Sequence, residues 1–323
     1  MFKVIITDSI YNRVLSTEES KDIEARSYFY KLLKQQKVEC LTAEETNAIK
    51  SHPEHVMKSP SSLFILDIPV TEALAIQRRY GVMCLSGERT NISQLIDVDD
   101  FHTPNEGEAL GRGWDSVLDS VEKLPSNALL LTDRYLFATR DKDAGDGLAN
   151  VQSIFNELLP LEFSGGDYHV TVVFCFDKMF YTYSFSEIAN KLNNIAQQSR
   201  RTFPIMMEVF GISEDSDIYD KMHSRRIISN YYLVEATHKL AAFNKNLGTA
   251  QQLLIPLALF TKTSLNGGSS SPLDSINQTI ADFQDFYKDI LSQKIKSVNY
   301  HYALNGMPMP RCTGIRNRLF KLS

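Results

Sequence analysis

The sequence predicts an α/β protein with two units, an N-terminal parallel-sheet unit followed by a second α/β domain. Short β-branched runs alternate with helical patterns along the first hundred residues, and this alternation is typical of a parallel sheet covered by helices. Residues 97–108 are acidic, contain Pro and Gly and have neither hydrophobic period, which is typical of a linker. Because the alternation resumes after this stretch, we assign residues 1–105 to the first unit and 106–323 to the second.

The elements expected in the first unit follow from hydrophobic periodicity and helix-start signals. Thr42 begins a short helix, because Thr42 and Glu45 have the spacing of a capping box. In chain order we expect a strand at 3–7, a helix at 20–36, a strand at 37–41, the short helix from 42, a strand at 62–68, a helix at 71–80 and a strand at 81–85.

The second unit repeats the pattern of buried strands and amphipathic helices. We expect helices at 114–122, 147–159, 185–198 and 273–291, and strands at 127–133, 169–176, 204–210 and 226–230. Residues 264–272 are rich in Gly and Ser and form a loop. The aromatic residues of the last helix recur at helical spacing, so we expect them in the core rather than in a ligand site.

Composition restricts the functions that the chain can have. Apolar residues make up 43% and charged residues 23%, which predicts a folded chain rather than a disordered one. The 34 basic and 39 acidic residues give a net charge of -5, so a nucleic-acid site would have to be a local basic patch. Apolar runs fall short of the ~18 residues of a membrane helix, and no signal peptide is recognisable. We therefore expect a cytoplasmic protein with no membrane partner.

The sequence gives no indication of a cofactor. The four cysteines are far apart and form no C-x-x-C pair, so we expect reduced thiols without zinc or a disulfide; they are Cys40, Cys84, Cys175 and Cys312. The sequence contains no G-x-x-x-x-G-K-S/T, G-x-G-x-x-G, G-x-S-x-G or H-E-x-x-H motif, which removes the best support for nucleotide hydrolases, dinucleotide enzymes, serine hydrolases and zincins.

One segment at the start of a predicted strand suits phosphate chemistry. His223 and Arg225 are two residues apart, so their side chains point to the same face of a strand. A histidine can attack phosphorus or move a proton, and a guanidinium can hold two phosphate oxygens. An exposed strand end with ordinary solvated charges is the alternative interpretation of these residues.

This segment resembles the phospholipase D-like superfamily, whose signature is H-x-K followed by four residues and D. It is most similar to the degenerate branch at the C-terminus of microtubule-interacting and trafficking (MIT) domain proteins, where H-D-R opens a similar strand. The chain has Arg225 in place of Lys and Asn230 in place of Asp. The stretch Leu129–Phe137, with Asp133-Arg134-Tyr135 at its centre, is similar to the strand ending in D-P-Y of that branch.

The resemblance implies a site and a quaternary structure. His223 would be the nucleophile or proton shuttle, Arg225 would hold phosphate oxygens and Asn230 would orient them without metal. Further phosphate contacts would come from Arg226, Thr237, His238 and Asn244. Members with a single motif complete their site across a homodimer. The departures at Arg225 and Asn230 shift the expectation from phosphodiesterase catalysis toward binding of a phosphate-bearing ligand, with nucleic acid as the first choice.

Two other functions stay open. Asp8 and Asp67 follow predicted parallel strands, and carboxylates at this edge of a sheet can hold Mg²⁺ or Mn²⁺. This arrangement resembles the opening of PIN-type nucleases, although aspartates at strand ends are also common helix caps. The third alternative is a non-catalytic interaction module, such as an accessory subunit of a prokaryotic defence or regulatory system with a protein partner.

Overall fold

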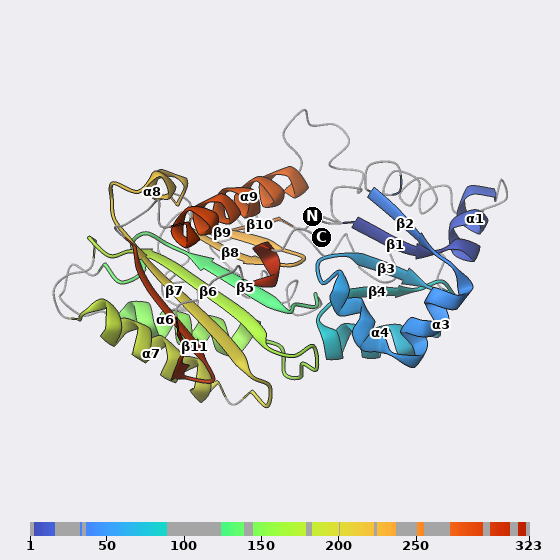
Figure 1. The fold of residues 1–323 in the computed structure, drawn as a ribbon, viewed down its shortest axis with the longest axis horizontal. Helices are drawn as coiled ribbons and strands as arrows, with labels where there is room; N and C mark the ends of the chain where they lie inside the picture. Colours follow the sequence, from blue (N-terminus) through green and yellow to red (C-terminus); the bar gives the residue numbers. More distant parts are fainter. Residues whose placement is uncertain are drawn as a thin grey trace.

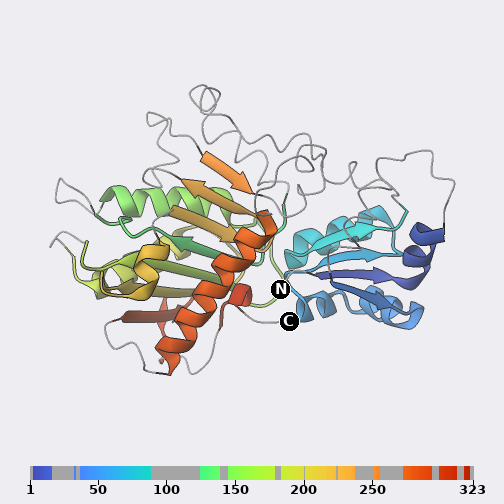
Figure 2. The ribbon, with the colours of Figure 1, turned by 90° about the horizontal axis from the view of Figure 1, so that it is seen from above.

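Two α/β units lie side by side in the computed structural model (Figures 1 and 2). The N-terminal unit comprises the described residues up to Glu88, and the C-terminal unit comprises those from Leu124 onward. The structure describes residues 3–16, 33, 37–88, 124–138, 145–178, 183–199, 201–222, 225–236, 251–254, 272–292, 298–310 and 316–320. The expected linker at 97–108, the helix at 114–122 and all but Leu33 of the helix at 20–36 lie outside these residues.

The N-terminal unit contains the expected parallel sheet. Its strand order is β2-β1-β3-β4, and Val4 of β1 is in register with Val38 of β2 and Leu63 of β3. All three strand pairs are parallel, which confirms the α/β prediction for this unit. The strands are β1 (Lys3–Thr7), β2 (Lys37–Leu41), β3 (Leu63–Leu66) and β4 (Met83–Ser86).

The helices of this unit begin and end where local chemistry requires. The capping box is confirmed, because the Thr42 hydroxyl accepts the Glu45 N–H at 3.2 Å and the Glu45 carboxylate accepts the Thr42 N–H at 2.9 Å. The helix α1, which we did not predict, follows β1 without a loop. The described helices are α1 (Asp8–Ser16), α3 (Ala43–Ser51), the 3₁₀ helix η1 (Pro53–Lys58) and α4 (Val70–Tyr80).

The C-terminal unit is built on an eight-stranded mixed sheet with the order β10-β9-β8-β5-β6-β7-β11-β12. The three strands β5, β6 and β7 are mutually parallel, and β8 pairs with β5 in the antiparallel direction. Four of the strands, β9 to β12, were not predicted. The strands are β5 (Ala128–Thr132), β6 (Tyr168–Cys175), β7 (Ile205–Ile212), β8 (Arg225–Ser229), β9 (Leu233–Ala236), β10 (Gln251–Leu254), β11 (Asn299–Leu304) and β12 (Met307–Pro308).

Helices cover both faces of this larger sheet (Figures 1 and 2). The helices α6 (Gly145–Leu158) and α7 (Phe185–Gln198) pack on one face. The helices α8 (Asp217–Lys221) and α9 (Pro272–Leu291) and the 3₁₀ helix η7 (Arg318–Phe320) pack on the other. The expected core aromatics Phe283, Phe286 and Tyr287 are buried against Phe210 and Phe320, and full burial of one such ring contributes roughly 1.5–3 kcal/mol.

The two units share one continuous core and a hydrogen-bonded junction. Apolar residues from both sheets belong to the same buried cluster. At the junction the Asn127 amide donates to the carbonyls of Pro60 and Gly81, both at 2.9 Å, and the Tyr231 hydroxyl donates to the Ser62 carbonyl at 2.7 Å. The amino end of β5 and the turn between β8 and β9 are therefore fixed to the N-terminal unit.

Within the part of the chain that the structure describes, no helix is both long and apolar enough to cross a membrane.

Candidate functional site at the carboxyl edge of the larger sheet

The sheet topology singles out the carboxyl ends of β5, β6 and β7. The chain runs from β5 to β7 through α6 and α7 and then returns to β8 on the other side of β5. In open α/β sheets, ligands bind outside the carboxyl ends of the strands where the strand order reverses. Figure 1 shows this edge, with α8, at the end of the sheet remote from the N-terminal unit.

A buried ion pair lies at this reversal point. Thr132 of β5 is in register with Arg226 of β8, so the next residues along, Asp133 and Arg225, face each other. The Arg225 Nε atom lies 3.4 Å from Asp133 Oδ1, which also accepts the Tyr135 N–H at 2.8 Å. Asp133 is only 1% exposed, and a carboxylate so far from water needs these partners to stay charged.

Two guanidinium groups converge on one aromatic ring beside this pair. The Arg225 Cζ atom lies 5.7 Å from the centre of the Tyr135 ring and the Arg134 Cζ atom lies 5.1 Å from it. Arg134 also lies 4.7 Å from the ring of Tyr219, which comes from α8. Such contacts between cations and rings stabilise the side chains in place. Burial raises the pKa of Tyr219, and its hydrogen bond with Tyr135 raises it further.

A third cation comes from the end of β6. Lys178 forms an ion pair with Glu214 at 2.7 Å, and this hydrogen bond raises the pKa of Lys178. Asp177 accepts the Glu214 N–H at 2.8 Å, which joins the loops that follow β6 and β7. The nearby thiol of Cys175 is buried, and burial raises its pKa, so it is a poor nucleophile at neutral pH.

We call the group of Asp133, Arg134, Tyr135, Lys178, Tyr219 and Arg225 the carboxyl-edge cluster. Its three cations, Arg134, Lys178 and Arg225, are balanced by the carboxylates of Asp133, Glu214 and Asp177. Guanidinium groups and aromatic rings at a strand edge can bind a planar or phosphorylated anion. The cluster is therefore suited to binding, and its described residues include no free general base.

Asn230 does not join this cluster. It follows β8 at the opposite edge of the sheet, five residues from Arg225, which corresponds to about 16 Å along a strand. Its amide oxygen accepts the N–H groups of Asn127 and Ala128 at 3.1 and 3.2 Å, and its amide nitrogen donates to the Ser61 hydroxyl at 2.9 Å. The structure thus places Asn230 in the junction between the two units, apart from Arg225.

Arg226 is occupied by other protein groups. Its Nε atom lies 2.6 Å from Glu235 of β9, and its Nη1 atom donates to Thr279 of α9 at 2.9 Å. His223, Thr237, His238 and Asn244 lie outside the described residues. The C-terminal stretch 311–321 is basic, with Arg311, Arg316, Arg318 and Lys321. Its Arg318 lies at the amino edge, where it donates to the carbonyls of Asn127 and Gly165 and burial lowers its pKa to about 10.

The alternative acidic pair lies at the corresponding edge of the smaller sheet. Asp8 follows β1 and Asp67 follows β3, two neighbouring parallel strands at which the strand order reverses. Both side chains are exposed, and the Asp67 N–H donates to the Thr7 hydroxyl at 3.2 Å. Among the described residues, no three His, Cys, Asp or Glu side chains are grouped so that they could hold a metal. The structure offers a pair of carboxylates here and no third ligand of these types within the described ranges.

Part of the carboxyl-edge cluster was not predicted from the sequence. Arg225 was predicted as a site residue, whereas Asp133 and Tyr135 entered only through a resemblance and Lys178 and Tyr219 were not predicted. One signal was present, because Asp133 ends a buried apolar strand in the same way as Asp67 does. Lys178 and Tyr219 have no such signal, since the strand order alone brings them to this edge.

The fold and the cluster define a two-unit α/β protein with an arginine- and tyrosine-lined site at the carboxyl edge of its larger sheet. No family model matches the sequence, and no curated protein and no solved structure matches the chain.

Proposed function

We propose that this protein binds a phosphate-bearing ligand at the carboxyl-edge cluster, with nucleic acid as the first ligand class. The observation that supports this proposal is the convergence of Arg134 and Arg225 on the Tyr135 ring at the point where the strand order reverses. Two segments far apart in the sequence, one ending β5 and one opening β8, meet there.

The cluster offers complementary contacts for a nucleotide. Guanidinium groups are suited to phosphate oxygens, which they can bind in bidentate geometry. Tyrosine rings provide faces on which bases stack, at roughly 1–3 kcal/mol per base. Asp133 contributes by holding Arg225 in one orientation at 3.4 Å, so less side-chain entropy is lost on binding.

The net charge of the chain favours a local rather than an extended contact. The protein carries -5 overall, and carboxylates balance the cations of the cluster, so a polyanion would be held by local contacts with the arginines and not by a broad positive surface. We therefore expect binding of a short single-stranded segment. If the protein also catalyses a reaction at this segment, that reaction is metal-independent phosphodiester cleavage with His223 as nucleophile.

The test is a binding titration with labelled single- and double-stranded DNA and RNA at several salt concentrations. Arg134→Gln and Lys178→Gln should each weaken binding and lower the slope of log K against log salt by about 1, as loss of one phosphate contact does. Arg79→Gln is the matched control, because Arg79 is an exposed arginine on α4 in the other unit. Unchanged affinity in both cluster variants, in protein that unfolds like the wild type, contradicts the proposal.

Cleavage assays separate this function from the two alternatives. Cleavage that resists EDTA and is abolished by His223→Ala supports catalysis by the phospholipase D-like segment. The position of Asp8 and Asp67 at the reversal point of the smaller sheet favours a second candidate, a metal-dependent nuclease. That candidate requires cleavage that depends on Mn²⁺ and is lost in Asp8→Asn. Absence of both binding and cleavage contradicts both proposals and leaves a non-catalytic accessory subunit.

A further inference from the structure

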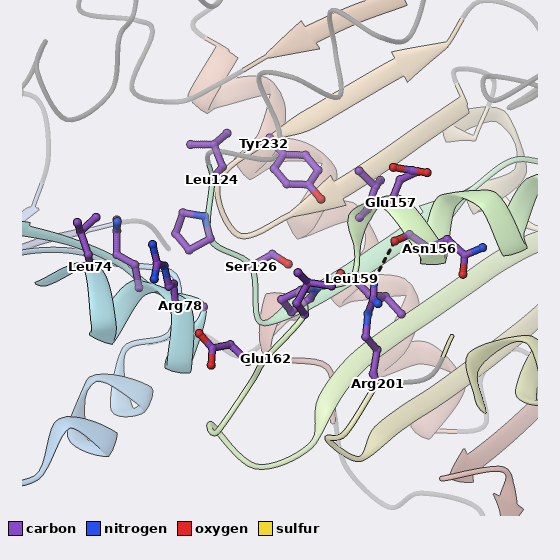
Figure 3. Close-up of a pocket in the computed structure, with 16 residues that line it drawn as sticks. Leu74, Arg78, Leu124, Ser126, Asn156, Glu157, Leu159, Glu162, Arg201 and Tyr232 are labelled. Atoms are coloured by element: carbon purple, nitrogen blue, oxygen red, sulfur yellow. Dashed lines mark hydrogen bonds between the residues drawn. The ribbon is translucent and has the colours of Figure 1, made fainter. Parts of the chain in front are cut away.

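A cavity of about 980 Å³ lies between the two units (Figure 3). Leu74 and Arg78 of α4 form one side, and Asn156, Glu157 and Arg201 of the C-terminal unit form the other. This volume is at the upper end of the roughly 300–1,000 Å³ that is usual for small-molecule sites, and such sites are often found between domains. The cavity lies at the amino edge of the larger sheet, so it is separate from the carboxyl-edge cluster.

Exposed apolar side chains concentrate at this cavity. Among the described residues four large apolar side chains are exposed, and two of them, Leu74 at 37% and Leu161 at 81%, line it. They come from different units. An exposed apolar surface of this kind is unfavourable in water and marks a binding surface when it lines a concave site. The lining therefore suits a ligand with an apolar body.

The cavity has two arginines that can bind an anion, Arg78 and Arg201. Arg201 is held by backbone carbonyls, of Asn156 at 2.7 Å and Leu159 at 2.9 Å, rather than by a carboxylate. Arg78 is exposed, and within the described ranges no ion pair joins it or Arg201 to the lining residues Glu157 and Glu162. Both glutamates are exposed. Burial lowers the pKa of Arg201, and the charge of Glu157 opposes this shift. The less hydrated arginine exerts the stronger field on a bound group.

We propose that the cavity between the two units binds a small organic anion with an apolar body, whose acidic group lies near Arg78 and Arg201. Such a ligand contacts both units at once and stabilises their junction. The proposal is independent of phosphate binding at the carboxyl-edge cluster.

Anilinonaphthalene sulfonate is a suitable probe, because it joins an aromatic body to one anionic group and fluoresces in apolar surroundings. We expect one site per chain, displacement by dodecanoate below its micelle concentration, and no displacement by dodecyltrimethylammonium. Arg78→Gln and Leu161→Ser should each raise the dissociation constant by about threefold to tenfold, the usual effect of losing one charge-assisted or apolar contact. Arg201 is not used as the variant because it holds the end of α6.

Two matched controls test whether the effect belongs to the cavity. Arg79→Gln alters the neighbouring arginine, which does not line it, and Met307→Ser removes another exposed apolar side chain, 65% exposed, on β12. Neither should change the dissociation constant, and all four variants should unfold cooperatively and bind oligonucleotides like the wild type. Absence of probe binding, equal displacement by the cationic competitor, or equal losses in the control variants overturns the proposal.

Discussion

Glu208 is a buried carboxyl group that the proposed functions do not use. It lies on β7 with 1% exposure. The Tyr287 and Tyr300 hydroxyls donate to its Oε1 atom, and the Thr171 hydroxyl lies 3.4 Å from Oε2. Burial raises the pKa of Glu208 to about 7, although these hydrogen bonds and the charge of Arg316 oppose the shift. Its protonation state thus changes near neutral pH.

This pKa predicts how stability depends on pH. The folded state keeps a proton on Glu208 up to about pH 7, whereas the unfolded chain releases it near the ordinary value of 4.5. The free energy of unfolding should therefore fall as pH rises through this window, by on the order of 3 kcal/mol from this group. Glu208→Gln, which keeps the shape without the titration, should remove that part of the slope. Urea unfolding at several pH values measures the free energy of unfolding of the wild type and of Glu208→Gln. An identical pH dependence in the two proteins would contradict the raised pKa of Glu208.

At the scale of elements, the sequence predicted the strands of the smaller sheet, the central strands of the larger sheet and the long helices, and it did not predict the outer strands β9 to β12 of the larger sheet. Central strands such as β5 and β6 are buried on both faces, so they are continuous apolar runs that periodicity detects. The strand β11 contains polar residues on both faces because Asn193 of α7 bonds His301 on one side and Glu208 bonds Tyr300 on the other. Only the tertiary partners explain that pattern.

The candidate site was predicted to a smaller extent. Arg225 was selected from its spacing with His223 and lies in the carboxyl-edge cluster, but Asn230, selected through the resemblance to the phospholipase D-like signature, lies at the opposite edge of the sheet. The spacing of a motif along one strand does not show at which end of the sheet each of its residues lies. That depends on the pairing of β8 with β5, which joins residues about a hundred positions apart.

Helix α7 offers a test of local helix-start chemistry. The Ser184 hydroxyl accepts the Glu187 N–H at 3.3 Å, and Glu187 accepts the Ser184 N–H at 2.6 Å. Ser184→Ala should lower the free energy of unfolding by about 1 kcal/mol because the cap is lost. Ser186→Ala is the control, since Ser186 is exposed inside the same helix and alanine has the higher helix propensity. Equal effects of the two changes in denaturant titrations would exclude a capping contribution.

At the scale of the whole molecule, the junction joins the two units into one cooperative folding unit. The helix α4 ends at Gly81, whose φ is 61°, and a Cβ atom there would lie 2.0 Å from the Ser126 carbonyl oxygen. Glycine is therefore required at this position for two reasons, the left-handed backbone and the close approach of the other unit. With the shared core, this contact leads us to expect a single cooperative unfolding transition.

Gly81→Ala tests the junction against a matched glycine. Gly166 has a φ of 88°, and among the residues that the structure describes only Arg318 lies near its Cβ position, at 3.7 Å. Gly166→Ala should therefore cost about 1–2 kcal/mol for the left-handed backbone alone, and Gly81→Ala should cost more because the units must move apart. Calorimetry measures the unfolding transition of each variant. If Gly81→Ala costs no more than Gly166→Ala, the contact with Ser126 contributes nothing to stability.

The junction also has a consequence for synthesis of the chain on the ribosome. The Pro60 carbonyl, which accepts from Asn230, precedes it by 170 residues. At about 5–20 residues per second, roughly 10–30 s pass between their synthesis. During this interval the newly made N-terminal unit presents the loop around Pro60 to water, first without Asn127, which follows Pro60 by 67 residues, and then without Asn230. We expect water to occupy the places of these donors until the C-terminal unit is made and the junction closes.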